Sequence, residues 1–172
     1  IPAQAPVLLY AGRLASEKDV LLIPDALLLL PENQLGELYV ISVGSGPLQE
    51  EWQRRLEAVL GERFHSFGFL SQSEIGRAYA MADALVCPSR QGETWGLVVN
   101  EALQFGLAVI ASDHVGSVRD LLAPPATPPA GSAVFASENP QAFAEALSGF
   151  AAAHPTGFQP RPVAALPHPH QL

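Results

Sequence analysis

The sequence predicts an α/β protein in which a parallel sheet is covered by helices on both faces. Short apolar runs alternate along the chain with longer segments that carry a helical apolar pattern. The runs are mostly apolar, which is typical of parallel strands that are buried on both faces. Glycine-rich or charged segments follow most of the runs, as expected of loops that lead from strands to helices.

The apolar runs and the helical patterns give explicit boundaries. We expect strands at Val7–Tyr10, Leu38–Val43, Phe64–Phe67, Ala84–Cys87, Ala108–Ala111 and Ala133–Phe135. We expect helices at Glu17–Leu30, Leu48–Leu60, Ser73–Met81, Gly96–Phe105 and Pro140–Ala153. Serine hydroxyls accept hydrogen bonds from the free N–H groups of a helix start, so we expect Ser16 to cap the first helix and Ser73 or Ser71 the third.

Composition limits the class of protein. With 172 residues, 48% hydrophobic and 15% charged, the chain is long and apolar enough for one domain with a sizeable core. The net charge of −8 and the scattered basic residues argue against nucleic acid as a partner. We predict a domain over residues 1–153 and a proline-rich extended tail over 154–172, with Pro124–Pro129 forming a loop before the last strand.

The location is inferred from cysteine usage and from the apolar segments. The single cysteine, Cys87, excludes a disulfide framework and fits a reducing compartment, so we expect a cytoplasmic protein. No charged leader with an apolar stretch opens the chain, and the apolar block Val20–Leu30 is interrupted by Pro24 and is too short to span a bilayer. The chain begins at Ile1 without Met, so we expect it to be part of a longer protein.

The most informative segment is PSRQGETWGLVVNE, which starts at Pro88. It places Glu93 in a loop after an apolar strand and Glu101 eight positions later on a predicted helix. The free N–H groups at a helix start attract anions such as phosphate. Eight helical positions leave two side chains about 80° apart around the axis and about 12 Å apart along it. Two acids at that spacing fit the hydroxyls of a nucleoside and a sugar joined by a diphosphate.

Other candidate residues also follow predicted strands, where ligands bind in open parallel sheets. Arg13 and Lys18 follow the first strand; an arginine holds phosphate oxygens in a fork, and a lysine adds a mobile point charge. Taken alone, this pair is better explained as a surface arginine and a lysine at a helix start. Gly44-Ser45-Gly46 follows the second strand as a tight turn or a ligand contact; Gln49 at the third glycine position excludes a dinucleotide fingerprint. Phe69, after the third strand, is either a packing residue or a ligand contact.

In order and spacing, these motifs resemble the C-terminal, donor-binding domain of a GT-B glycosyltransferase of the retaining family-four type, also called glycosyl transferases group 1. The resemblance runs from about Val7 to Phe150 and includes Pro88-Ser89, Glu93, Gly96 and Glu101-Ala102-Leu103. It implies a Rossmann-like parallel sheet and transfer of a sugar from a nucleoside-diphosphate sugar, with UDP or GDP, to an acceptor hydroxyl. It also implies an N-terminal acceptor-binding domain, which we expect to be missing here.

The resemblance assigns roles residue by residue. Arg13 and Lys18 would bind the diphosphate and stabilise the charge that develops on it, and Glu93 would bind the hydroxyls of the sugar, so these three are the implied catalytic residues. Glu101 would accept hydrogen bonds from the ribose. The implied donor-binding set is Gly12, Gly44, Gly46, Phe69, Leu70, Glu93, Thr94, Trp95, Gly96, Leu97 and Glu101.

The chain departs from the family pattern at Asp19, where the family often has glycine, and at Thr94-Trp95, where many members have Gly-Phe. The sequence holds no Asp-x-Asp motif, so we expect neither a metal nor another cofactor. Membrane association of the intact protein is left open. Two alternatives remain at this point: a binding module without activity, and a GT-B phosphorylase that uses inorganic phosphate as acceptor.

Overall fold

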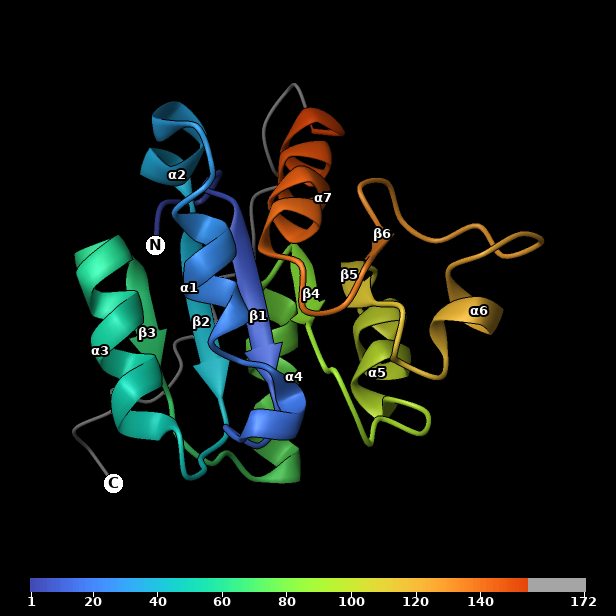
Figure 1. The fold of residues 1–172 in the computed structure, drawn as a ribbon, viewed down its shortest axis with the longest axis horizontal. Helices are drawn as coiled ribbons and strands as arrows, with labels where there is room; N and C mark the ends of the chain where they lie inside the picture. Colours follow the sequence, from blue (N-terminus) through green and yellow to red (C-terminus); the bar gives the residue numbers. More distant parts are fainter. Residues whose placement is uncertain (155–172) are drawn as a thin grey trace.

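The computed structural model of the protein describes residues 1–154, which form a parallel six-stranded sheet with the strand order β3-β2-β1-β4-β5-β6 (Figure 1). The strands are β1 (Val7–Ala11), β2 (Tyr39–Val43), β3 (Phe64–Ser66), β4 (Ala84–Cys87), β5 (Ala108–Ser112) and β6 (Ala133–Phe135). Every predicted strand is present, and the predicted α/β class with a Rossmann-like sheet is confirmed. Strand β1 pairs with β2 on one side and with β4 on the other, so Leu8 lies opposite both Val40 and Ala84.

Helices connect the strands and cover both faces of the sheet. The α-helices are α1 (Leu22–Leu27), α2 (Glu32–Glu37), α3 (Gln49–Leu60), α4 (Gln72–Met81), α5 (Leu97–Gln104), α6 (Val118–Leu121) and α7 (Pro140–Ala152). Two short 3₁₀ turns are η1 (Ser16–Lys18) and η2 (Gly61–Arg63). Helices α2 and α6 are missing from the sequence-based prediction, because each is too short to show a helical apolar period.

Alternate residues of each strand belong to two hydrophobic cores, one on each face of the sheet. Leu8 of β1 packs against α1, α3 and α7 on one face, whereas Leu9 packs against α4 and α5 on the other. In Figure 1, helices α1, α3 and α7 lie in front of the strands, and α4 and α5 lie behind them. Because both faces are buried, most strand positions are apolar, which explains the apolar runs in the sequence.

The predicted helix Glu17–Leu30 is wrong at its start. The segment divides into η1 and α1 because Asp19 adopts a left-handed conformation with φ of 48°. Pro24 lacks an N–H donor and is therefore tolerated only in the first turn of a helix, so the helix begins at Leu22. Ser16 is not a cap: Ala15 holds that position, and no side chain caps the turn.

The starts of α4 and α7 follow the capping rules. Ser71, one of the two expected caps, precedes α4, and its N–H donates to the Glu74 carboxylate at 3.1 Å. The Ser71 hydroxyl donates to the same carboxylate. This hydrogen bond, and then the one from the N–H, hold the pKa of Glu74 below its usual value. Helix α7 begins after Asn139, whose side chain accepts a hydrogen bond from the Ala142 N–H at 3.0 Å.

The predicted loop at Pro124–Pro129 is present between α6 and β6 and extends away from the sheet (Figure 1). The predicted proline-rich tail lies outside the described residues except for His154. Within residues 1–154, none of the helices has the length and apolar character needed to cross a bilayer.

The core should be most sensitive at the stacked pair Phe135 and Phe143, whose ring centroids are 4.4 Å apart. Phe143 is fully buried, so Phe143→Ala should lower the free energy of unfolding by about 3–5 kcal/mol. Phe69→Ala is the matched control, because Phe69 is 79% exposed and its loss should change stability by less than about 0.5 kcal/mol. Urea unfolding followed by circular dichroism measures both, and equal midpoints would contradict the assigned core.

Candidate functional site

A cavity of about 390 Å³ lies at the carboxyl ends of β1 and β4, next to each other in the middle of the sheet. The connections from these two strands run to opposite faces of the sheet, and ligands bind in open α/β sheets at such a reversal. Predicted site residues that line this cavity are Gly12, Arg13, Lys18, Glu93, Thr94, Trp95, Gly96 and Leu97. The sheet therefore brings together two loops that are far apart in the sequence.

A second cavity of about 310 Å³ adjoins the first. Its lining includes the predicted residues Gly44, Phe69 and Leu70, together with Gly12 and Arg13, which line both cavities. Gly12 and Arg13 therefore mark the boundary between the two spaces. Among the predicted residues, Gly46 and Glu101 line neither cavity.

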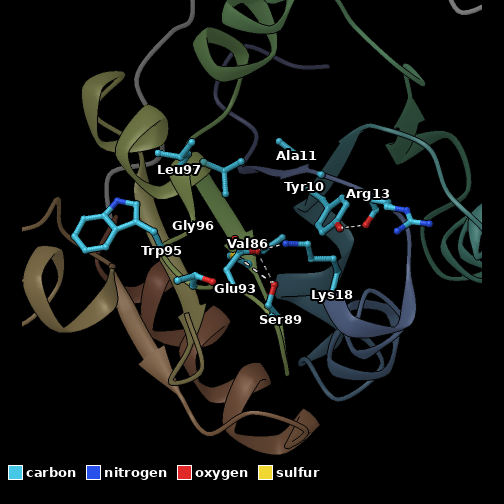
Figure 2. A pocket seen from close by; sticks show the side chains of 15 residues that line it. Tyr10, Ala11, Arg13, Lys18, Val86, Ser89, Glu93, Trp95, Gly96 and Leu97 are labelled. Carbon is cyan, nitrogen blue, oxygen red and sulfur yellow. Dashed lines mark hydrogen bonds and ion pairs between the residues drawn. The ribbon is translucent and has the colours of Figure 1, made fainter. Parts of the chain in front are cut away.

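Lys18 and Glu93 form an ion pair inside the first cavity (Figure 2). The Lys18 ammonium donates to Glu93 Oε2, and the Ser89 hydroxyl donates to the same oxygen at 3.2 Å. The side chains of Lys18 and Glu93 are only 24% and 16% exposed. Sequence reasoning assigned no role to Ser89, although it noted the Pro-Ser pair; the buried hydroxyl now fixes the orientation of the carboxylate.

Backbone hydrogen bonds join the two loops that carry this ion pair. The N–H groups of Arg90 and Gln91 donate to the Glu17 carbonyl at 3.1 and 3.3 Å. The Arg90 guanidinium donates to the Ser16 carbonyl at 3.1 Å and to the Glu138 carboxylate at 3.2 Å. Through these hydrogen bonds, Arg90 holds η1 against the loop before Glu93. Its side chain does not line the first cavity.

The loop after β5 supports the loop that carries Glu93. The Gly116 N–H donates to the Glu93 carbonyl at 3.1 Å, and the Ser117 N–H donates to the Trp95 carbonyl at 2.9 Å. A Cβ on Gly116 would lie 1.9 Å from the Thr94 carbonyl oxygen, so only glycine allows this approach. The sequence analysis gave no reason to expect this backbone support.

Helix α5 starts at the floor of the first cavity. Gly96 precedes it with φ of 86°, and a Cβ there would approach Val115 Cγ1 to 2.8 Å. The N–H groups of the first turn of such a helix are available to an anion. Among residues 1–154, the Ser117 hydroxyl is a buried side-chain group without a hydrogen-bond partner, and it lies 3.7 Å from the Cβ position of Gly96.

Two further groups in the lining are neutral. Burial raises the pKa of Tyr10 above its usual range, so its hydroxyl stays protonated and donates to the Arg13 carbonyl at 2.7 Å. Burial, and then the negative charge of Glu93, raise the pKa of Cys87 to about 11, so this thiol is a poor nucleophile at neutral pH. Arg13 itself is 65% exposed and pairs loosely with Glu17 at 3.6 Å.

Glu101 and Gly46 lie outside the cavity linings. The Glu101 carboxylate accepts a hydrogen bond of 2.5 Å from the Tyr79 hydroxyl, a contact between α5 and α4 that sequence reasoning missed. A Cβ on Gly46 would lie 2.3 Å from the Leu14 carbonyl oxygen, so this glycine allows two loops to meet. No group of three or more His, Cys, Asp or Glu side chains in the described residues is placed to hold a metal ion.

The comparisons with known proteins agree with this architecture. The family profile described as "Glycosyl transferases group 1" matches residues 1–152. A sulfoquinovosyl transferase of Arabidopsis thaliana is 32% identical over 69% of this chain and 21% of its own length. A GDP-mannose-dependent alpha-mannosyltransferase of Mycobacterium tuberculosis is 35% identical over 72% of this chain and 29% of its own length.

Among solved structures, the Anabaena protein HepE in complex with UDP superposes with a TM-score of 0.69 and 22% identity. The superposition covers 85% of this chain and 39% of the Anabaena chain. The chain therefore spans between about a fifth and two fifths of the length of these proteins. The profile match over nearly all described residues shows that the chain belongs to the glycosyl transferases group 1 family.

Proposed function

We propose that this chain is the donor-binding domain of a retaining glycosyltransferase, and that the intact enzyme transfers a sugar from a nucleoside-diphosphate sugar to an acceptor hydroxyl. The observation that carries the proposal is the first cavity, where cations from the β1 loop meet an acid and a helix start from the β4 loop. A diphosphate needs the cations and the helix start, and a sugar needs the acid.

The two adjoining cavities suit the two ends of such a donor. The diphosphate would lie at their boundary, where Gly12 and Arg13 line both spaces. The sugar would lie in the first cavity beside Glu93, and the base would lie in the second beside Phe69 and Leu70. Two similar proteins support this class of ligand, since one is a GDP-mannose-dependent enzyme and the structure of another is a complex with UDP.

In the proposed reaction, the bond from the anomeric carbon to the diphosphate oxygen breaks as the acceptor oxygen forms its bond on the same face. The leaving phosphate oxygen takes the proton of the acceptor hydroxyl. Lys18 and Arg13 stabilise the charge that develops on the diphosphate, which is the task a metal ion performs in other transferases. Glu93 holds the sugar hydroxyls, and no side chain of this chain forms a covalent intermediate.

The remaining features of the enzyme belong to the same proposal. An N-terminal acceptor-binding domain would form the other wall of the cleft and complete the intact protein. We propose a cytoplasmic location for the intact protein, because Cys87 is a free thiol and fits a reducing compartment. Membrane association of the intact enzyme is compatible with this assignment, since the acceptor is bound outside this chain.

The chain should bind UDP or GDP without a divalent metal, because Lys18, Arg13 and the start of α5 supply the positive charge. Isothermal titration with each nucleotide, in EDTA and then in Mg²⁺, measures this. Binding should be equal in the two buffers and modest, since one wall of the cleft would be absent. Heat released only with Mg²⁺ would contradict the role of the cations, and no heat at millimolar nucleotide would contradict the proposed function.

Glu93 and Glu101 should report on different parts of the donor. Glu101→Gln should weaken UDP and UDP-sugar alike by ~10- to 100-fold, the value of one charge-assisted hydrogen bond. Glu93→Gln should weaken only the UDP-sugar by a similar factor. It should leave UDP bound at least as well, because Lys18 no longer has its carboxylate partner. Titration of both variants with both ligands tests the assignment. Loss of UDP binding in Glu93→Gln would contradict the assignment of Glu93 to the sugar end of the site.

Gly116→Ala should weaken nucleotide binding, because its Cβ would push the Thr94 carbonyl and move the loop that carries Glu93. Gly149→Ala is the control, since Gly149 is an exposed helix residue with no atom within 4 Å of its Cβ position. That change should instead raise stability by about 0.5–1 kcal/mol and leave binding unchanged. Melting curves and titration of both variants separate the effects; normal binding by Gly116→Ala would contradict the supporting role of this loop.

A further inference from the structure

Tyr79 on α4 contacts Glu101 on α5 directly. The Tyr79 hydroxyl donates to Glu101 Oε2 at 2.5 Å, and the side chain of Tyr79 is 1% exposed. Its ring stacks on Phe105, which ends α5, with centroids 5.4 Å apart and planes 17° apart. Both the ring and the hydroxyl of Tyr79 are therefore fixed against α5.

The Tyr79–Glu101 pair lies on the two helices that contribute Val98 and Ile75 to the cavity linings. Val98, three positions before Glu101 on α5, lines the first cavity. Ile75, four positions before Tyr79 on α4, lines the second. Residues three or four apart share a face of a helix, so each member of the pair lies one turn from a cavity wall. A ribose between a diphosphate and a base would occupy the space between these two walls.

The chemistry of the pair suits the recognition of a diol. An ionised carboxylate offers about four acceptor positions on its two oxygens, and the Tyr79 hydroxyl uses one of them. Burial, and then the hydrogen bond to Glu101, raise the pKa of Tyr79 above its usual range, so the hydroxyl remains a donor. A carboxylate that is held at one oxygen keeps its other acceptor positions in a fixed direction.

We propose that Tyr79 is a positioning residue that orients the Glu101 carboxylate toward the 2′ and 3′ hydroxyls of the donor ribose. In this way Tyr79 sets the preference of the site for ribonucleotides over deoxyribonucleotides. The inference rests on the proposed function, in which Glu101 binds the ribose, and extends it to a residue on a neighbouring helix.

A purely structural role for Tyr79 makes a different prediction. The stacking on Phe105 depends on the ring, whereas the orientation of Glu101 depends on the hydroxyl. Tyr79→Phe keeps the ring and removes only the hydroxyl, so the fold should persist. Tyr39→Phe is a matched control, because Tyr39 is the first residue of β2 and lies at the amino ends of the strands, opposite to the cavities.

The test is a titration of the parent chain, Tyr79→Phe, Tyr39→Phe and Glu101→Gln with UDP and GDP, each beside its 2′-deoxy and 3′-deoxy forms. The parent and Tyr39→Phe should prefer the ribose form by ~10-fold or more, which is the value of a hydrogen bond to a charged group. Tyr79→Phe should lose most of this ratio, with binding of the deoxy forms unchanged. Glu101→Gln should lose it as well.

The outcomes separate the inference from the proposed function. If Tyr79→Phe keeps the full ratio while Glu101→Gln loses it, Tyr79 does not orient the carboxylate, and the proposed function stands. If the parent binds nucleotides without preferring ribose, both the inference and the ribose role of Glu101 are overturned. If the parent binds none of the nucleotides, the proposed function itself is wrong. If Tyr79→Phe weakens ribose and deoxyribose forms equally, its role is structural.

Discussion

Strand β1 lies between β2 and β4, and the chain leaves β1 and β4 toward opposite faces of the sheet. This reversal opens a space above the carboxyl ends of the two strands, because the helices that follow them diverge. It also brings Lys18 beside Glu93, although 75 positions separate them in the sequence. All the contacts of the first cavity depend on this strand order, so the order matters more to the site than any one of its residues.

The ion pair in the first cavity has a consequence for ligand binding. A partly buried charge without a partner is unfavourable, so Lys18 and Glu93 stabilise each other while no ligand is bound. A diphosphate would take Lys18 as its partner, and a sugar would then satisfy the released carboxylate. A donor with both parts would pair with both charges. With a bare nucleotide, the Glu93 carboxylate would keep only the hydrogen bond from Ser89 and contacts with water. Under the proposed function, the ion pair would therefore favour the complete donor over its nucleotide half.

The strands and the strand-end loops could be predicted from sequence because both follow from local patterns. Strands buried on both faces are mostly apolar, and the topological rule then places Arg13, Lys18 and Glu93 at the carboxyl ends of the strands. The first helix was predicted wrongly because the left-handed conformation of Asp19 is not visible as a break in the apolar pattern. The contact from Tyr79 to Glu101 could not be predicted, since it depends on how two helices pack on the same face.

Close backbone approaches join the loops at the carboxyl ends of the strands. A Cβ on Gly44 would lie 1.9 Å from the Gly12 carbonyl, and one on Gly116 would lie equally close to the Thr94 carbonyl. Each glycine thus joins two loops that follow neighbouring strands, on either side of β1 and β4. Loops that are fixed before a ligand arrives lose little conformational entropy on binding. Under the proposed function, this chain would therefore hold its donor contacts in place before an acceptor-binding domain completes the cleft.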